Sequence, residues 1–234
     1  MINMKKIAAE KACEYVENGM IVGLGTGSTA YYATCRLGEL VQQGMGLTGV
    51  ATSKDTEKLA MEMGIPMKSL DEVKQIDLTI DGADEVDDGL NGIKGGGGAL
   101  LREKLVASFS RQTSWIIDES KLVAEIGQFP LPVEVVPFGH LQTATMLEKL
   151  TGEPADLRLR GDGEPFVTDN QHFIYDLSIG RIQEPKRLHA ALVELPGVVE
   201  TGLFIDMADR VIVGRADGTV DVISRQDLSY NRRK

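Results

Sequence analysis

The first half of the chain alternates between short apolar runs and stretches with helical periodicity. This alternation is typical of a mostly parallel sheet with helices on both faces, because each crossover between parallel strands places a helix against the sheet. The expected strands are 20–22, 47–51, 78–80 and 114–117, and the expected helices are 4–16, a stretch reaching residue 40, 56–63 and 99–108. We therefore predict an α/β fold class for this part of the chain.

The pattern changes after Phe129, where prolines at 130, 132 and 137 interrupt it. The elements expected there are strand 133–136, helix 139–150, strands 156–160 and 172–177, helix 184–195 and strand 198–204. This order is that of a ferredoxin-like α+β unit. We predict a Rossmann-like α/β domain from 1–128 and 206–234, whose sheet also receives strands 211–213 and 220–223, and a smaller ferredoxin-like domain from 129–205.

Charge and composition narrow the classes of partner. The net charge is −10, which disfavours binding to nucleic acid or to an anionic membrane, and only the tail Arg232, Arg233 and Lys234 is locally basic. No apolar run is long enough for a signal peptide or a membrane span. Cys13 and Cys35 lack metal-ligand spacing and are interpreted as reduced structural residues. We expect a cytoplasmic enzyme.

The segment Gly23–Thr29, with sequence GLGTGST, joins a strand to a helix. Its glycines allow close approach of a ligand, and the following helix would direct amides at an anion such as a phosphate. A dinucleotide site is less favoured, because Ser28 replaces the third glycine of that fingerprint. The segment could instead be only a tight turn. Thr52, Ser53 and Thr56 could add hydroxyls to the same anion or form a helix N-cap.

Two further loops carry unusual polar chemistry. Asp81-Gly82-Ala83-Asp84-Glu85 places three carboxylates directly after a strand, where they could accept hydrogen bonds from sugar hydroxyls. Alternatively, Asp84, Glu85 and Asp87 could form a solvated turn. Lys94 precedes four glycines and a helix, and so many glycines are unfavourable for folding unless their backbone binds a ligand. Glu103 lies one turn inside that helix, where it could face the loop or solvent.

The residue types also disfavour other chemistries. The three histidines, His140, His172 and His189, have no metal-ligand spacing, so we expect no metal site and a carboxylate as the base. No serine or cysteine has an evident basic partner for covalent acyl chemistry. We expect that the enzyme uses no cofactor.

Taken in order, these segments resemble the type A ribose-5-phosphate isomerase family along nearly the whole chain. The motifs are GTGSTA, TSKDTEKL, DGADEVD, KGGGGALLREK, DESKLV, FPLPVEVVPFG, VTDN and LPGVVETGLF. Each motif alone is weak, whereas the ordered set is very specific. Gln171 and the segment Leu157–Pro165 depart from the family pattern. Because they lie in the second predicted domain, we expect them to bear on oligomer contacts more than on catalysis.

The resemblance implies an isomerase that interconverts D-ribose 5-phosphate and D-ribulose 5-phosphate through an enediolate, in the non-oxidative pentose phosphate pathway. Glu103 would be the base, and Asp81 and Asp84 would bind sugar oxygens and assist ring opening. Lys94 and the Gly95, Gly96 and Gly97 amides would stabilise the oxyanion. Substrate contacts are also implied for Thr26, Gly27, Ser28, Thr29, Gly82, Ala83 and Lys121. Lys121 could instead be a surface lysine after a strand. The family also implies a homodimer or homotetramer.

Three alternatives remain open at this point. The first two are related enzymes on the same scaffold, an amino-sugar phosphate deaminase or a coenzyme A transferase, which the DGAD and KGGGG motifs disfavour. The third is a non-catalytic sugar-phosphate sensor, such as the effector domain of a transcriptional regulator. The presence of Glu103 and Lys94 disfavours the sensor, and we expect no DNA-binding segment before the domain.

Overall fold

The computed structural model describes residues 2–227, so the basic tail Arg232, Arg233 and Lys234 lies outside the described residues. The chain forms two compact units. The first unit contains the residues up to 83, residues 102–122 and the residues from 206 onward, and the second contains residues 84–101 and 123–205. Helix α4, Leu100–Ser108, begins in the second unit and continues in the first.

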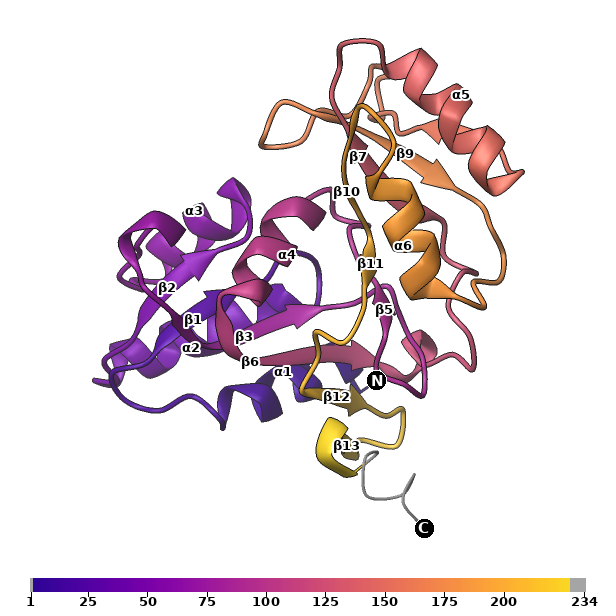
Figure 1. Cartoon of the computed structure of the whole chain (residues 1–234). Helices are drawn as coiled ribbons and strands as arrows, with labels where there is room; N and C mark the ends of the chain where they lie inside the picture. The colour runs from indigo at the N-terminus through magenta and orange to yellow at the C-terminus, as the bar shows by residue number, and fades with distance from the viewer. Residues whose placement is uncertain (1, 228–234) are drawn as a thin grey trace. The chain divides into compact units, whose positions relative to one another are not determined.

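A six-stranded sheet forms the centre of the first unit (Figure 1). Its order is β13-β12-β6-β3-β1-β2, and every neighbouring pair is parallel except β12 and β13. The strands are β1 Ile21–Leu24, β2 Thr48–Ala51, β3 Ile76–Gly82, β6 Ser110–Asp118, β12 Arg210–Gly214 and β13 Val220–Ser224. The mostly parallel sheet is confirmed, and so is the return of the last two strands to it.

Helices cover both faces of this sheet. They are α1 Met4–Cys13, α2 Ala30–Gln42, α3 Lys54–Glu62 and α4, with a short 3-10 turn at Leu70–Glu72 and another, η2, at Glu119–Lys121. Val22 and Leu24 of β1 pack in a core cluster with residues of α1, α2 and α3. Gly23 faces the other way, and a Cβ built there would lie 2.8 Å from Val106 Cγ1 of α4. Because alternate strand residues face opposite sides, α4 covers the second face.

The second unit contains a four-stranded antiparallel sheet of order β10-β7-β9-β8. Its elements are β7 Leu131–Val135, α5 His140–Thr151, β8 Ala155–Leu157, β9 Phe173–Leu177, α6 Pro185–Val193 and β10 Val198–Thr201. This is the βαββαβ order predicted for a ferredoxin-like unit. Its core includes Leu131, Val133, Leu147, Tyr175 and Leu192.

A three-stranded sheet of order β11-β5-β4 was not predicted. Its strands are β4 Glu85–Val86, β5 Gly92–Ile93 and β11 Leu203–Phe204. Strands of two residues carry no periodicity that a sequence could display. The predicted strand 198–204 is wrong in one respect, because it is interrupted at Gly202, whose N–H donates to Pro132 O at 2.7 Å.

The two compact units and the predicted domains share their main elements but differ in two segments. Residues 84–101 and 123–128 belong to the second unit, whereas the prediction assigned them to the first domain. The predicted boundaries at 128/129 and 205/206 remain a prediction about folding domains. No helix among residues 2–227 combines the length and apolar character needed to cross a membrane.

Candidate active site

Asp81 lies where the strand order of the first unit reverses. Strand β1 has β2 on one side and β3 on the other, so the loop after β1 and the end of β3 flank a topological switch point, where open α/β sheets bind ligands. The Asp81 side chain is 1% exposed, and its Oδ1 accepts hydrogen bonds from the N–H groups of Thr26 (3.0 Å) and Gly82 (2.8 Å). The carboxylate is therefore tied to the loop after β1.

Residues Gly25–Thr29, here called the GTGST loop, are held by buried hydroxyl groups. Thr26 Oγ1 lies 2.7 Å from Thr52 Oγ1, 2.9 Å from Ser53 Oγ and 3.2 Å from Thr56 Oγ1. Thr52 and Thr56 also donate to the carbonyls of Leu24 (3.1 Å) and Gly25 (3.0 Å). Three of these hydroxyl residues are buried, so they position the loop, while Gly27 and Ser28 at its tip are exposed.

Ser53 resolves one alternative left open by the sequence. It is the N-cap of α3, and its Oγ accepts from the N–H of Thr56 at 3.1 Å. The N-cap interpretation is thus confirmed, although the same hydroxyl also reaches the GTGST loop. Helix α3 begins at Lys54, two residues earlier than predicted, because Ser53 is the N-cap and the helix starts directly after it.

Lys5 is a candidate that the sequence analysis missed. Its Nζ donates to Ser28 Oγ at 2.8 Å, so a positive charge on α1 lies at the exposed tip of the GTGST loop. The two residues are 23 positions apart, and no local pattern relates them. An ammonium group beside glycine amides at a helix start is a favourable arrangement for an anion.

Glu103 and Lys121 are two further predicted residues of the first unit. Glu103 lies in the first turn of α4 and is 4% exposed, so it is not a surface charge. Lys121 is half-buried at the end of η2, which Asp118 caps by accepting from Ser120 N at 3.1 Å. A buried carboxylate at a fixed position on a helix suits a general base.

In the second unit, Lys94 follows β5 directly. It is 2% exposed, its N–H donates to Gly202 O at 2.9 Å, and its Nζ lies 5.2 Å from the centroid of the Phe204 ring. The three-stranded sheet thus supports Lys94 from both β5 and β11. The ring face can make a cation–π interaction with the ammonium group.

The run Lys94–Gly98, here called the glycine loop, forms a tight turn in the second unit. Gly98 N–H donates to Gly95 O at 2.9 Å, and both residues have positive φ, +79° and +100°. Gly96 N–H donates to Asp84 Oδ2 at 2.8 Å, and a Cβ on Gly96 would lie 2.7 Å from Asp84 Oδ1. A side chain at position 96 would therefore displace the Asp84 carboxylate from this contact.

The acidic residues of the DGADE motif, and Asp87 after it, make different contacts. Asp81 belongs to the first unit and Asp84 to the second, whereas Glu85 is buried and accepts from the N–H groups of Gly127 (2.6 Å) and Phe129 (2.7 Å). Asp87 accepts from the N–H groups of Gly89 and Asn91, both at 2.8 Å, which makes it a turn residue. Glu85 and Asp87 are therefore structural.

The histidines have structural partners in the second unit. Nδ1 of His140 lies 2.8 Å from Tyr175 Oη, Nδ1 of His172 lies 2.9 Å from Glu134 Oε1, and Nδ1 of His189 lies 2.8 Å from Thr201 Oγ1. Within residues 2–227 no three His, Cys, Asp or Glu side chains are grouped as metal ligands would be.

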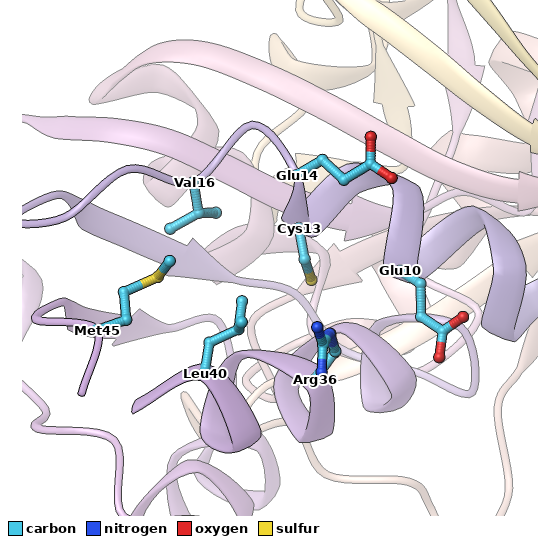
Figure 2. Close-up of a pocket in the computed structure, with 7 residues that line it drawn as sticks. All are labelled: Glu10, Cys13, Glu14, Val16, Arg36, Leu40 and Met45. Atoms are coloured by element: carbon cyan, nitrogen blue, oxygen red, sulfur yellow. The ribbon is translucent and has the colours of Figure 1, made fainter. Parts of the chain in front are cut away.

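A pocket of about 450 Å³ in the first unit contains none of the predicted site residues (Figure 2). Side chains from α1, α2 and the segments that follow these helices line it, and Arg36 points toward Cys13. Burial raises the pKa of the Cys13 thiol to about 12, so this thiol stays protonated near neutral pH. The structural interpretation of Cys13 agrees with this environment.

Comparison with known proteins identifies the family. Residues 48–218 match the family described as ribose 5-phosphate isomerase A (phosphoriboisomerase A). Ribose-5-phosphate isomerase A of Listeria innocua is 52% identical over 225 residues, which cover 96% of this chain and all of that protein. The chain belongs to the ribose-5-phosphate isomerase A family. The resemblance based on the ordered motifs is thereby confirmed, and the family is one of isomerases.

Solved structures of the family have the same fold. A D-ribose-5-phosphate isomerase in complex with phospho-erythronic acid superposes with a TM-score of 0.91 at 40% identity, covering 95% of this chain and all of that one. Ribose 5-phosphate isomerase of Plasmodium falciparum also gives a TM-score of 0.91, at 41% identity, covering 94% of this chain and 97% of that one. The predicted α/β fold class is confirmed.

Proposed function

We propose that this protein interconverts D-ribose 5-phosphate and D-ribulose 5-phosphate by proton transfer through an enediolate, as a step of the non-oxidative pentose phosphate pathway. The observation that carries the proposal is the buried carboxylate of Glu103, in the first turn of the helix that follows the glycine loop. Burial keeps a base away from bulk water and makes its position definite, which are the properties that proton abstraction from carbon requires.

In this mechanism Glu103 removes the proton from C2 of the open-chain aldose and returns it to C1. A proton moves from the oxygen on C2 to the oxygen on C1, so the reaction is an internal redox exchange that balances without a hydride acceptor. Asp81 and Asp84 bind sugar oxygens and assist ring opening. These assignments follow the family resemblance together with the burial of Asp81 and the contact between Asp84 and Gly96.

Negative charge on the enediolate oxygen is stabilised by Lys94 and by amides of Gly95, Gly96 and Gly97. Lys94 is buried, so its charge acts in a medium of lower dielectric constant than water. The Gly96 N–H donates to Asp84 Oδ2 at 2.8 Å, so this amide already faces a carboxylate oxygen. A positioned base accelerates a reaction by about 10²- to 10⁴-fold. Electrostatic stabilisation of the enediolate therefore contributes much of the remaining rate enhancement.

The phosphate binds at the exposed tip of the GTGST loop. Thr26, Gly27, Ser28 and Thr29 offer amides and hydroxyls, and Lys5 and Lys121 offer positive charge. The support for this assignment is the Lys5 contact with Ser28 and the position of Thr29 directly before α2. Gly82 and Ala83, between the two aspartates, contact the sugar in the same proposal.

The ligand of one relative suggests a probe. Phospho-erythronic acid carries a carboxylate, whose two oxygens on one planar carbon share the charge and shape of an enediolate. We expect it to bind this protein in competition with ribose 5-phosphate, because groups arranged for the intermediate bind its analogues more tightly than the substrate.

The deciding experiment measures ribose 5-phosphate conversion by chelator-treated protein, with Glu103→Gln and Glu57→Gln run in parallel. Glu57 is a matched control, because it is an exposed acid in the first turn of α3. We expect Glu103→Gln to bind phospho-erythronic acid and to lose at least about 100-fold in kcat. Glu57→Gln should be unaffected.

Three results would contradict the proposal. Unchanged turnover by Glu103→Gln would remove Glu103 from the mechanism. Binding without turnover by the wild type would favour the sugar-phosphate sensor, an alternative that family membership does not support. Activity that a chelator abolishes and a divalent ion restores would overturn the proposal that no metal is needed.

We also propose a homodimer or homotetramer in the cytoplasm. Phe138 and Leu141 near the start of α5 are 94% and 64% exposed, which is unusual for large apolar side chains and suits association between copies. Both cysteines are free thiols, as is common in a reducing compartment. Light scattering during size-exclusion chromatography measures the assembly, and a monomeric mass at micromolar concentration would contradict it.

A further inference from the structure

A hairpin in the second unit contacts the glycine loop. It includes residues 158–166, and most of it belongs to the segment Leu157–Pro165, which departs from the family pattern and was expected to bear on oligomer contacts. Arg158 N–H donates to Ile174 O of β9, and Phe166 N–H donates to Arg158 O, both at 2.8 Å. A bridge between Leu159 and Pro165 closes the hairpin. Arg158 and Phe166 are therefore held at its base.

Arg158 connects β9 to the glycine loop through its guanidinium group. Nε donates to Asp176 Oδ2 at 2.8 Å, and Nη2 donates to the other carboxylate oxygen, so the ion pair is bidentate. Nη1 donates to Gly95 O at 2.8 Å and to Gly96 O at 3.3 Å. The side chains of Arg158 and Asp176 are 15% and 25% exposed. A bidentate pair fixes the plane of the guanidinium, and that plane fixes the direction of Nη1.

Holding these two carbonyls determines where two amides point. In a planar trans peptide the C=O of one residue and the N–H of the next point in opposite directions. The Gly95 carbonyl therefore determines the direction of the Gly96 N–H, and the Gly96 carbonyl determines that of the Gly97 N–H. Glycine has the widest backbone freedom, so without such bonds these peptides would sample several orientations.

A second contact restrains the end of the loop. A Cβ built on Gly98 would lie 2.3 Å from Phe166 Cζ, so the aromatic ring packs directly against the Gly98 backbone. Asp84 restrains the middle of the loop through its bond with the Gly96 N–H. The loop is thus held at Gly95, Gly96 and Gly98 by side chains that are distant in sequence, Arg158 being 63 residues from Gly95.

We propose that Arg158, oriented by Asp176, is a positioning residue that aligns the Gly96 and Gly97 amides for the enediolate oxyanion. The inference rests on the proposed isomerase function, and it adds a role for a residue outside the predicted site. Arg158 acts through the backbone and does not touch the substrate. Preorganised amides stabilise an oxyanion without reorganising during the reaction, so their loss reduces kcat more than substrate binding.

The test compares Arg158→Ala with Arg160→Ala by steady-state kinetics and thermal unfolding. Arg160 lies on the same hairpin and forms an exposed ion pair with Asp162 at 3.2 Å, so it controls for loss of a surface arginine. We expect Arg158→Ala to lose about 100-fold in kcat, the effect of removing one oxyanion donor, with KM changed less than about threefold. Millimolar guanidinium should restore part of the activity of Arg158→Ala and none in Arg160→Ala.

Arg158→Lys provides a second test if the alanine variant does not fold. Lysine keeps the positive charge but lacks the planar guanidinium group. It therefore cannot donate twice to Asp176 and also reach the carbonyls of Gly95 and Gly96. We expect it to be folded and to lose at least about tenfold in kcat.

The outcomes separate the two proposals. If the wild type turns over substrate and folded Arg158→Ala has a kcat within twofold of the wild-type value, the role of Arg158 is overturned. The isomerase function is then left intact. A loss of activity that matches the loss of folded protein would also overturn it, because the ion pair would then be only structural. Absence of turnover by the wild type would overturn both proposals.

Discussion

The GTGST loop and the glycine loop have similar compositions, but they are held by different means. In the GTGST loop the bonds come from hydroxyls of Thr52 and Ser53, which follow β2, and of Thr56 on α3; Ser53 also donates to Thr56. In the glycine loop the carbonyls bond to Arg158 and the central amide bonds to Asp84. The first loop is held largely by hydroxyls between the end of β2 and the first turn of α3, and the second by charged side chains that bond its backbone directly.

This difference relates to the proposed tasks of the loops. A phosphate is bound equally before and after isomerisation, so the GTGST loop needs a rigid backbone and an exposed tip. The enediolate exists only during the reaction, and its charge is stabilised by amides whose direction is already correct. Changes to the two loops should therefore affect different kinetic parameters.

The largest effect is expected from Gly25→Ala, in which a Cβ would lie 2.0 Å from Asp81 Oδ1 and 2.5 Å from the Asp81 Cα. Because one of these atoms is backbone, Asp81 or the loop must move by an appreciable distance. We expect kcat/KM to fall at least about 100-fold, since small misplacement of catalytic groups has effects of that order. Gly161→Ala, where nothing lies within 4 Å of the built Cβ, is the control. Equal activities of the two variants would show that the GTGST loop does not need a rigid backbone.

An intermediate effect is expected from Lys5→Met, with Lys6→Met as the control. Lys5 contacts Ser28, whereas the adjacent Lys6 is exposed and lies 3.7 Å from Glu10. A hydrogen bond to a charged group contributes about 1.5 to 3 kcal/mol, so KM for ribose 5-phosphate should rise about 10- to 100-fold while kcat changes little. A kcat effect without a KM effect would remove Lys5 from the phosphate site.

The smallest effect is expected from Ser53→Ala, which removes the N-cap of α3 and one bond to the GTGST loop. Loss of an N-cap destabilises proteins by about 1 kcal/mol, which urea unfolding would measure. Ser53→Thr keeps a hydroxyl at the cap and should recover most of the stability. Thr26 retains two other hydroxyl neighbours, so we expect the activity of the folded variant to change little. A large loss of turnover in a fully folded variant would place Ser53 in the site itself.

Much of the fold follows from local patterns. The helices and the longer strands lie within a few residues of their predicted positions, because apolar periodicity reports which face of an element is buried. The two-residue strands β4, β5 and β11 were missed because elements so short carry no periodicity. The predicted strand 114–117 is longer in the structure, beginning at Ser110, because its polar first residues pair with β3.

Chemistry concentrated in short segments indicated a candidate site in the sequence. Asp81, Asp84, Lys94 and Glu103 were predicted because unusual residues follow strands or precede a helix, and their roles stay a prediction. Glu85 was grouped with them as a carboxylate, whereas the structure buries it against the amides of Gly127 and Phe129. Sequence spacing alone could not show that Glu85 accepts from backbone groups 42 and 44 positions away.

The sequence by itself determined the alternation of strands and helices, the ferredoxin-like order of the later elements and, through its ordered motifs, the family. Only the tertiary structure decided that Lys5 reaches Ser28, that buried hydroxyls hold the GTGST loop, and that Arg158 holds the glycine loop. The physical reason is that local pattern reports which side of an element is buried, whereas contacts between distant residues depend on strand order and register. Those in turn depend on the packing of the whole unit.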